Sequence, residues 1–417
     1  MSQQSYRVSL VLFFLGTGIS WFGNTLASIA IPWYVLSTTG SAAKTGVAAS
    51  VSGIGVVCGA MFGGVLIDRL GPRKTVLLAD LLSGLTLAGI PLLALSGRLS
   101  FPLLLILAFG GALLDPPGNA GRQAYLPRLA APAGLSPERA NASYTGVLQG
   151  TNLIGAALAG VLIATFGVAS VLWLDVATFC IAIGLLLYAR PGEAPAPPPQ
   201  DDPERGPGGG AMVRFVRDAF AGMRFLWYEP VLRGFVLAGT IQSFLTPVLL
   251  GVIIPVYILH NYGSAGRLGF LLAAYTTGAL ASATLYGLVG HRLPRRRLII
   301  ALGLVAPLGL ALLVTTVPLG VAMLALLLLG AEQGPISAIA NAQLQRQTPP
   351  VLLGRVITAT FAFALLGGPI GTLLGGLSIE RLGLQGTILI VLCCSFARWM
   401  ILRGNRAMRA LDRDTAR

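Results

Sequence analysis

The sequence predicts an all-α membrane protein whose twelve transmembrane helices form two pseudo-symmetric six-helix bundles. Hydrophobic residues make up 55% of the chain and charged residues only 11%, whereas about 25% of the residues of a typical soluble protein are charged. The apolar residues fall in runs long enough to cross a bilayer, which takes about 20 residues. The two halves of the chain also resemble each other. These observations exclude a soluble protein and leave no room for a soluble domain.

Twelve apolar runs follow one another along the chain. They lie near 9–36, 45–67, 75–96, 101–121, 142–166, 169–189, 232–259, 267–289, 298–317, 319–340, 356–379 and 385–403. The first run has no strongly basic start and is longer than the apolar core of a signal peptide, so we expect it to be a retained span.

The basic residues predict the orientation of the spans. The chain has 29 Lys and Arg against 15 Asp and Glu, a net charge of +14. If the N-terminus is cytoplasmic, all basic residues except Lys44, Arg98, Arg267 and Arg381 fall on the cytoplasmic side. Because Lys and Arg accumulate in cytoplasmic loops, we expect a multi-pass protein of the cell (inner) membrane with both termini in the cytoplasm. The positive charge then needs no nucleic-acid partner.

A segment rich in proline and glycine, 191–210, separates the two halves and predicts a cytoplasmic linker. In the segment that follows, 212–227, apolar residues recur at helical spacing with arginines on another face, which indicates a helix lying on the membrane surface. We therefore expect an N-terminal bundle over 1–190, a linker with this interfacial helix over 191–230, and a C-terminal bundle with a basic tail over 231–417.

The halves repeat in sequence. IPWYVLSTTGSA (31–42) matches IPVYILHNYGSA (254–265), and GVLIDRLGPRK (64–74) matches GLVGHRLPRRR (287–297) at the same displacement. An even number of spans in each half makes the two repeats parallel. Such repeats are related by an axis along the membrane normal, with a cavity between them.

The loop after the second span carries the most specific motif. Its residues are Gly64, Asp68, Arg69, Gly71, Arg73 and Lys74. On spacing alone, the basic residues could simply hold the loop inside. The motif matches at nearly every position the signature G-x-L-x-D-R-x-G-R-[KR] of the major facilitator superfamily, which the chain resembles over all twelve spans. The resemblance implies a gating latch in which Asp68 faces the start of the eleventh span, where a helix N-terminus favours a carboxylate. His291 replaces this acid in the second copy.

Two further segments, IAIPWYVLSTTGS (29–41) and ANASYTGVLQGTNLIGAALAG (140–160), resemble the bacterial drug-exporter branch that includes macrolide-efflux and enterobactin-export proteins. This resemblance implies export by proton antiport with rocker-switch alternating access. The branch often has a Gly-Pro pair in the fifth span. Here Ala156 follows Gly155, and the pair occurs in the eleventh span as Gly368 and Pro369.

Four acids lie within the apolar runs, namely Asp80, Asp115, Asp175 and Glu332. An acid at mid-membrane costs at least about 2.5 kcal/mol, so each is expected to face a cavity or a partner. For Asp80 the alternatives are a functional role and pairing with an arginine of the inner loops. For Asp175 they are a functional role and simple solvation at the outer end of its span.

Asp115 and Glu332 occupy nearly matching places in the two repeats, beside prolines that would break or kink their helices. We assign proton coupling to these two acids. The alternative is a structural ion pair, such as Asp115 with Arg122.

A substrate cavity is predicted from spans one and seven together with the coupling acids. Its candidate residues are Trp21, Asn24, Asp115, Gln242, Phe244 and Glu332. An aromatic, weakly polar cavity with two acids would suit an amphipathic or cationic organic solute. Helix packing is the alternative explanation for each of these residues.

The sequence thus predicts a secondary active exporter of small amphipathic molecules, driven by protons. The alternatives are an exporter or symporter of one metabolite, such as a siderophore, sugar or lipid, and a transport-inactive membrane receptor. We expect no enzyme activity, cofactor or metal, since there is no nucleophile–base pair and His260 and His291 have no cluster of ligands around them. We also expect a monomer whose partners are its solute, protons and the lipid bilayer.

Overall fold

The computed structural model describes residues 3–189, 220, 222–290, 293–405 and 407–408, and within these ranges the regular structure is entirely helical. The predicted linker over 191–210 lies outside the described residues. So does most of the predicted interfacial helix over 212–227, of which residues 220 and 222–227 are described and are helical.

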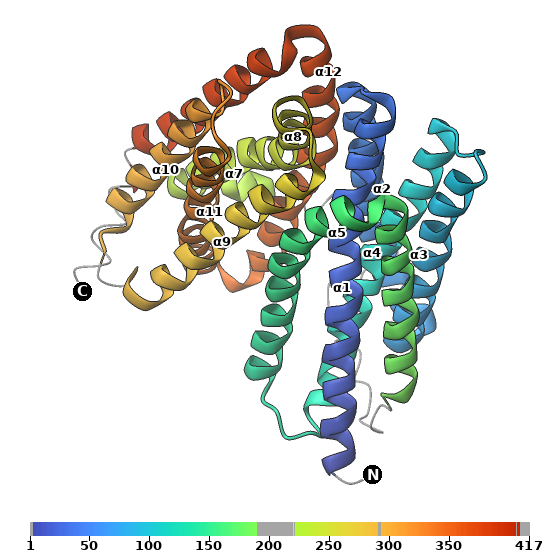
Figure 1. Cartoon of the computed structure of the whole chain (residues 1–417). Coiled ribbons are helices and arrows are strands. Elements are labelled where there is room, and N and C mark those ends of the chain that lie inside the picture. The colour runs from blue at the N-terminus through green and yellow to red at the C-terminus, as the bar shows by residue number, and fades with distance from the viewer. Residues whose placement is uncertain (1–2, 190–219, 221, 291–292, 406, 409–417) are drawn as a thin grey trace. The chain divides into compact units, whose positions relative to one another are not determined.

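The first half of the chain forms five long helices (Figure 1). They are α1 (Gln3–Thr39), α2 (Ala42–Leu70), α3 (Pro72–Leu95), α4 (Phe101–Ala130) and α5 (Pro137–Tyr188). Gly167 interrupts α5 with a non-helical φ of 77° and ψ of 163°. A residue with a side chain rarely adopts this backbone conformation. The interruption separates the fifth and sixth predicted spans.

The second half repeats this order. Its elements are α7 (Pro230–Val248), η1 (Leu249–Ile253), α8 (Ile254–Tyr262), α9 (Ala265–Val289), α10 (Arg295–Leu312), α11 (Leu319–Gln347) and α12 (Pro350–Gly404). The short π-helix η1 continues α7 into α8, so these three elements form one span. Gly383, with φ of 75°, divides α12 just as Gly167 divides α5.

In the described part of the chain, nine helices are long and apolar enough to cross a membrane. Two of them, α5 and α12, each contain two spans joined at a non-helical glycine. The 18-residue α10, which begins with three arginines, supplies the remaining span. The predicted all-helical membrane fold is therefore confirmed.

The helices group into two compact units. Unit 1 comprises Met1–Ala30, Val51–Gly155 and Phe166–Arg214, and unit 2 comprises Ile31–Ser50, Ala156–Thr165 and Phe215–Arg417. One end each of α1 and α2, and a segment in the middle of α5, thus belong to unit 2. The predicted bundles divide the chain at a single linker, whereas these units follow the contacts between helices.

Glycines allow α2 and α4 to pack closely in unit 1. A methyl group on Gly59 would collide with the carbonyl oxygen of Leu113, and one on Gly55 would lie 2.7 Å from that of Phe109. Pro117 cannot donate a hydrogen bond to Leu113, so this carbonyl lacks its usual helical partner. The absence of a side chain at Gly59 lets the α2 backbone approach this carbonyl.

Glycines likewise allow α9 and α11 to pack closely in unit 2. A methyl group on Gly278 would collide with the carbonyl oxygen of Leu327, and one on Gly330 with that of Tyr275. Such close packing of small residues is typical of helix pairs in membranes. The prolines of α4 and α11 do not break these helices, which run continuously over Phe101–Ala130 and Leu319–Gln347. Of the two expected effects of these prolines, a break or a kink, the break is therefore absent, and the kink stays a prediction.

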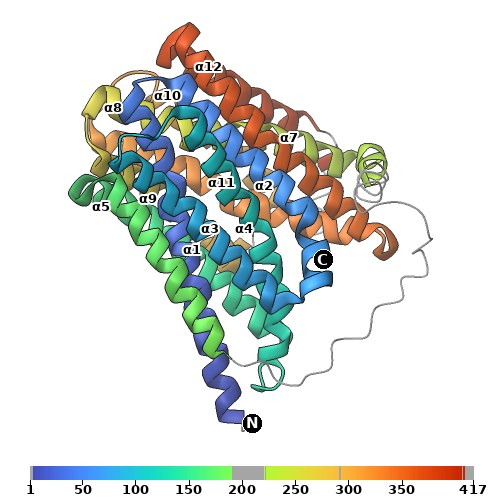
Figure 2. The same cartoon turned by 90° about the vertical axis from the view of Figure 1, so that its right-hand side faces the viewer.

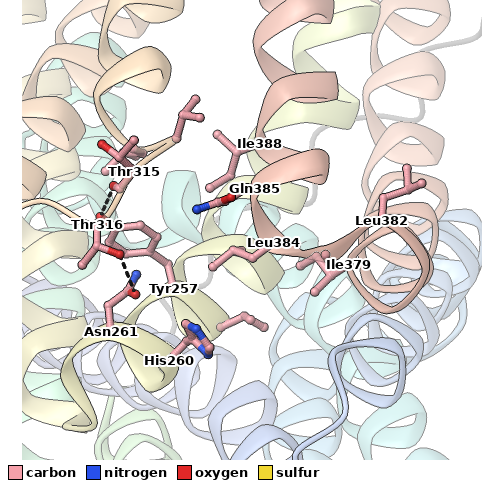
Figure 3. Close-up of a pocket in the computed structure, with 14 residues that line it drawn as sticks. Tyr257, His260, Asn261, Thr315, Thr316, Ile379, Leu382, Leu384, Gln385 and Ile388 are labelled. Atoms are coloured by element: carbon pink, nitrogen blue, oxygen red, sulfur yellow. Dashed lines mark hydrogen bonds between the residues drawn. The ribbon is translucent and has the colours of Figure 1, made fainter.

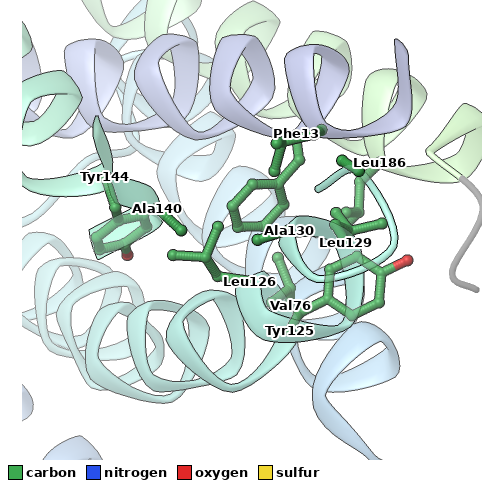
Figure 4. Close-up of a cluster of buried hydrophobic side chains, with 11 residues drawn as sticks. Phe13, Val76, Tyr125, Leu126, Leu129, Ala130, Ala140, Tyr144 and Leu186 are labelled. Atoms are coloured by element: carbon green, nitrogen blue, oxygen red, sulfur yellow. The ribbon is translucent and has the colours of Figure 1, made fainter. Parts of the chain in front are cut away.

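A hydrophobic cluster holds α1, α3, α4 and α5 together in unit 1 (Figure 4). Phe13 of α1 contacts the Tyr125 ring of α4 at a centroid distance of 5.9 Å, and Val76 and Leu186 come from α3 and α5. The Tyr125 hydroxyl donates a hydrogen bond of 3.1 Å to the carbonyl of Ala189. Helices α3 and α4 also run side by side in both views (Figures 1 and 2).

Candidate functional site

A buried ion pair joins α3 and α4 in unit 1. Nη2 of Arg122 lies 2.7 Å from Oδ1 and 2.8 Å from Oδ2 of Asp80, and the two side chains are 5% and 4% exposed. The same nitrogen also lies 2.9 Å from the hydroxyl of Ser20 on α1. Of the two alternatives for Asp80, a functional role and pairing with an arginine, the structure therefore shows the pairing. Its partner Arg122, which we had assigned to an inner loop, is buried inside α4.

Asp115 lies one and a half to two turns before Arg122 on α4 and is half-buried. The hydrogen bonds of Arg122 go to Asp80 and Ser20. The alternative pairing of Asp115 with Arg122 is thus not the contact that this structure forms. Asp115 nevertheless lies within electrostatic range of both Arg122 and Asp80.

Asp175 is buried rather than solvated, with 1% of its surface exposed. The Thr178 hydroxyl donates to its Oδ1 at 3.1 Å, while its Oδ2 has no hydrogen-bond partner among the described residues. Gly23 of α1 packs so closely on both side chains that any larger residue would collide with them. The solvated alternative for Asp175 is therefore wrong.

Glu332 of α11 forms the corresponding buried ion pair of unit 2. Nη2 of Arg398, on α12, donates a hydrogen bond to Oε1 of Glu332, and the two side chains are 3% and 2% exposed. Like Arg122, Arg398 was assigned to the cytoplasmic end of its span but is buried within the helix. The sequence does indicate a buried Arg398, because this residue lies inside the predicted apolar run 385–403.

A cavity of about 440 Å³ lies in unit 2 between α7, α11 and α12, and we call it the α7–α11–α12 cavity. Its polar lining residues are Thr240, Gln242, Ser243, Thr246, Gln333, Ser337, Asn341, Thr360 and Arg398. Nε2 of Gln242 donates to Oγ1 of Thr246 at 2.9 Å and to Oε1 of Gln333 at 3.2 Å. Of the predicted cavity residues, Gln242 lines this space, whereas Phe244 is not among the described residues that do.

The two candidates on α1, Trp21 and Asn24, are half-buried in unit 1. The neighbouring Thr25 donates a hydrogen bond of 3.0 Å to Oδ1 of Asn152, which joins α1 to α5. Their assignment to a substrate site stays a prediction.

The motif after the second span forms a tight turn between α2 and α3. Gly71 has a φ of 79°, and Pro72 begins α3. Nη2 of Arg73 lies 2.8 Å from the carbonyl oxygen of Leu187 and 3.3 Å from that of Leu186, so it caps the end of α5. Such a cation satisfies carbonyls that have no partner within the helix.

The other residues of the motif are more open. Asp68, Arg69 and Lys74 are exposed, and a methyl group on Gly64 would meet no described atom within 4 Å. Gly64 is thus not a close-packing residue in this structure. His291, which replaces Asp68 in the second copy, lies outside the described residues, and the interaction of Asp68 with the eleventh span stays a prediction.

A second cavity of unit 2, of about 480 Å³, lies beside the turn at Gly383 (Figure 3). His260, Asn261 and Gln385 contribute polar groups to its lining, and Leu384 contributes an apolar one. The described residues contain no group of three or more His, Cys, Asp or Glu side chains that could hold a metal ion.

The chain matches the family model described as Major Facilitator Superfamily over residues 13–250 and 239–404. It is 30% identical to the "Multidrug efflux pump Tap" of Mycobacterium tuberculosis (strain ATCC 25618 / H37Rv) over 418 residues, which cover 98% of this chain and 96% of that protein. It is also 30% identical to the "Enterobactin exporter EntS" of Escherichia coli (strain UTI89 / UPEC) over 393 residues, which cover 90% of this chain and 89% of that protein.

Solved structures share the fold at lower sequence identity. A crystal structure of the nucleoside transporter NupG superposes with a TM-score of 0.67 at 13% identity, covering 96% of this chain and 98% of that one. A crystal structure of a D-xylose-proton symporter superposes with a TM-score of 0.69 at 15% identity, covering 94% and 96%. At these identities the likeness concerns the fold alone.

Proposed function

Because this chain belongs to the Major Facilitator Superfamily and is a multi-pass membrane transporter, we propose that it exports small amphipathic organic molecules by proton antiport. The observation that carries the proposal is the similarity, over nearly the whole chain, to a relative named as a multidrug efflux pump. Export proceeds by rocker-switch alternating access of two bundles, 1–190 and 231–417, in the cell membrane. The termini and the linker lie in the cytoplasm, and the protein works as a monomer.

The α7–α11–α12 cavity supports this substrate class. Ligand pockets have volumes of about 300 to 1,000 Å³ and are mostly apolar with a few polar groups that orient the ligand. A volume of about 440 Å³ falls in this range. Its apolar lining residues include Phe235, Val236 and Leu344, and its polar ones include Gln242. We also propose Trp21, Asn24, Phe244 and the two coupling acids as substrate-binding residues, on the basis of their places in the sequence.

Asp115 and Glu332 are the proposed proton-binding groups. Carboxyl groups within a membrane are costly when charged and are typical of proton relays. Asp115 is half-buried and is not the hydrogen-bond partner of Arg122, so its carboxyl is available to bind and release a proton. The loop motif from Gly64 to Lys74 serves as the gating latch, with Asp68 as its acid and Arg73 as its cap on α5.

The test is efflux of ethidium from proteoliposomes under an imposed proton gradient. We expect gradient-dependent movement with the wild type, at least tenfold slower movement with Asp115→Asn, and unchanged movement with Glu138→Gln. Glu138 is an exposed acid in the first turn of α5, outside the proposed site, and so provides a matched control. Equal rates in all three proteins would refute the coupling role of Asp115. Failure of the wild type to move any dye of a broad panel would refute the proposed export.

Export of one metabolite is the second candidate. It is favoured by the similarity to a relative named as an enterobactin exporter and by the many amides and hydroxyls that line the cavity. A multidrug exporter should move structurally unrelated dyes that compete with one another. Movement of a single compound class, with no competition from other dyes, would instead favour the metabolite exporter.

A further inference from the structure

Arg398 carries the only formal charge among the described residues that line the α7–α11–α12 cavity. A guanidinium has several N–H donors and no acceptor. One nitrogen, Nη2, donates to Glu332, whereas Nε has no hydrogen-bond partner among the described residues although it is buried. A buried donor without a partner loses the hydrogen bond that water would have given it. Arg398, a lining residue of the cavity, therefore has donor capacity that no described residue uses.

The charge balance of this cavity disfavours a purely cationic ligand. Glu332 is paired with Arg398, and the other polar lining groups among the described residues are neutral amides and hydroxyls. A cation entering the cavity would meet one positive charge and no unpaired carboxylate. A carbonyl, phenolate, carboxylate or sulfonate group would meet a guanidinium with an unused N–H, and hydrogen bonds to a charged partner are about twice as strong as neutral ones.

We propose that Arg398 binds a hydrogen-bond-acceptor or anionic group of the transported molecule, in competition with Glu332. The transported class is then an amphipathic molecule with an apolar body and an acceptor group at one end. The body would pack against Phe235 and Val236. The proposal rests on the proposed transport function, whose general substrate class it makes more specific.

Because the ligand competes with Glu332 for Arg398, protonation of Glu332 should affect ligand binding. A neutral Glu332 no longer forms an ion pair with the guanidinium, so Arg398 is then available to the ligand. Among the described residues, Tyr275 of α9 is a further titratable group within electrostatic range of the pair.

The experiment compares two fluorescent probes that share one aromatic body. 8-Anilinonaphthalene-1-sulfonate carries an anionic sulfonate, and N-phenyl-1-naphthylamine lacks it. Binding of each is titrated to the full-length protein in nanodiscs of neutral lipid. We expect Arg398→Gln to weaken sulfonate binding about tenfold, the usual worth of a hydrogen bond to a charged group, and to change binding of the neutral probe less than twofold. We expect Glu332→Gln to strengthen sulfonate binding by a similar factor.

The double variant Glu332→Gln/Arg398→Gln provides the control for folding. It replaces the ion pair by two amides, so no buried charge is left unpaired, and it should bind the neutral probe normally while losing the preference for the sulfonate. Equal sulfonate binding by the wild type and the double variant would overturn the proposal. Parallel loss of both probes in a folded protein would also overturn it, because the site would then not recognise charge. These titrations need no transport, so their failure is distinguishable from failure of the proposed export.

Discussion

Arg122 of α4 holds both carboxylate oxygens of Asp80 on α3, at 2.7 and 2.8 Å, where neither side chain is more than 5% exposed. One nitrogen also lies within hydrogen-bond distance of Ser20 on α1. A single guanidinium thus connects three helices of unit 1. Removing one partner of such a pair leaves an uncompensated charge in a low-dielectric environment, which is strongly destabilising.

Asp80→Asn should therefore lower the free energy of unfolding by about 3–5 kcal/mol. The measurement is thermal or denaturant unfolding of the purified protein in detergent. Asp80→Asn/Arg122→Gln should recover most of the loss, because the amide pair leaves no charge behind. Wild-type stability in the single variant would show that the ion pair does not support the fold.

Gly59→Ala should destabilise unit 1 by about 1–3 kcal/mol, the usual cost of overpacking. The added methyl group would collide with the carbonyl of Leu113, which belongs to the backbone of α4 and cannot rotate away. Gly64→Ala, on the same helix, is the matched control and should be neutral, since no described atom lies within 4 Å of its methyl group. The measurement is the melting temperature of each variant relative to the wild type. Equal shifts in the two variants would contradict the close packing of α2 on α4.

Arg73→Gln should cost about 1.5 kcal/mol, because the carbonyls of Leu186 and Leu187 lose a charged donor at the end of α5. Lys74→Gln removes a charge from the exposed neighbouring position and should change stability by less than about 0.5 kcal/mol. Chemical unfolding of both variants provides the comparison. A larger loss with Lys74→Gln than with Arg73→Gln would rule out the capping role.

Gln242→Ala should raise the concentration of 8-anilinonaphthalene-1-sulfonate needed for half-maximal binding about fivefold, the equivalent of one net hydrogen bond. Its amide joins Thr246 and Gln333 in the lining of the α7–α11–α12 cavity. Gln385→Ala alters the second cavity of unit 2 and should leave this concentration unchanged. The reverse order of effects would place the substrate in the cavity beside Gly383.

The spans and their breaks were predictable from the sequence. Apolar runs of the right length gave all twelve spans, and the gaps near 167 and 383 coincide with Gly167 and Gly383 in non-helical conformations. Hydropathy is enough to locate the helices, because backbone N–H and C=O groups within a bilayer must form hydrogen bonds with each other. A helix satisfies these groups within one segment. The prolines of α4 do not interrupt the helix, although Pro117 removes one of its backbone hydrogen bonds.

The partners of the intramembrane acids could not be predicted in the same way. Arg122 and Arg398 stand near the ends of apolar runs, where an arginine ordinarily marks a cytoplasmic loop. That they turn inward depends on which helices pack against α4 and α12, and a linear hydropathy pattern does not contain this information. The burial of Asp175 has the same cause, since it depends on how closely Gly23 of α1 approaches α5.

The most direct test of proton-driven export measures proton movement itself. Purified protein is reconstituted into liposomes that enclose a pH-sensitive dye, and ethidium is added with no imposed proton gradient. We expect ethidium transport to drive a counterflow of protons in the wild type and in Glu138→Gln, and none in Asp115→Asn. Ethidium transport without any proton movement, or full proton movement in Asp115→Asn, would contradict this expectation.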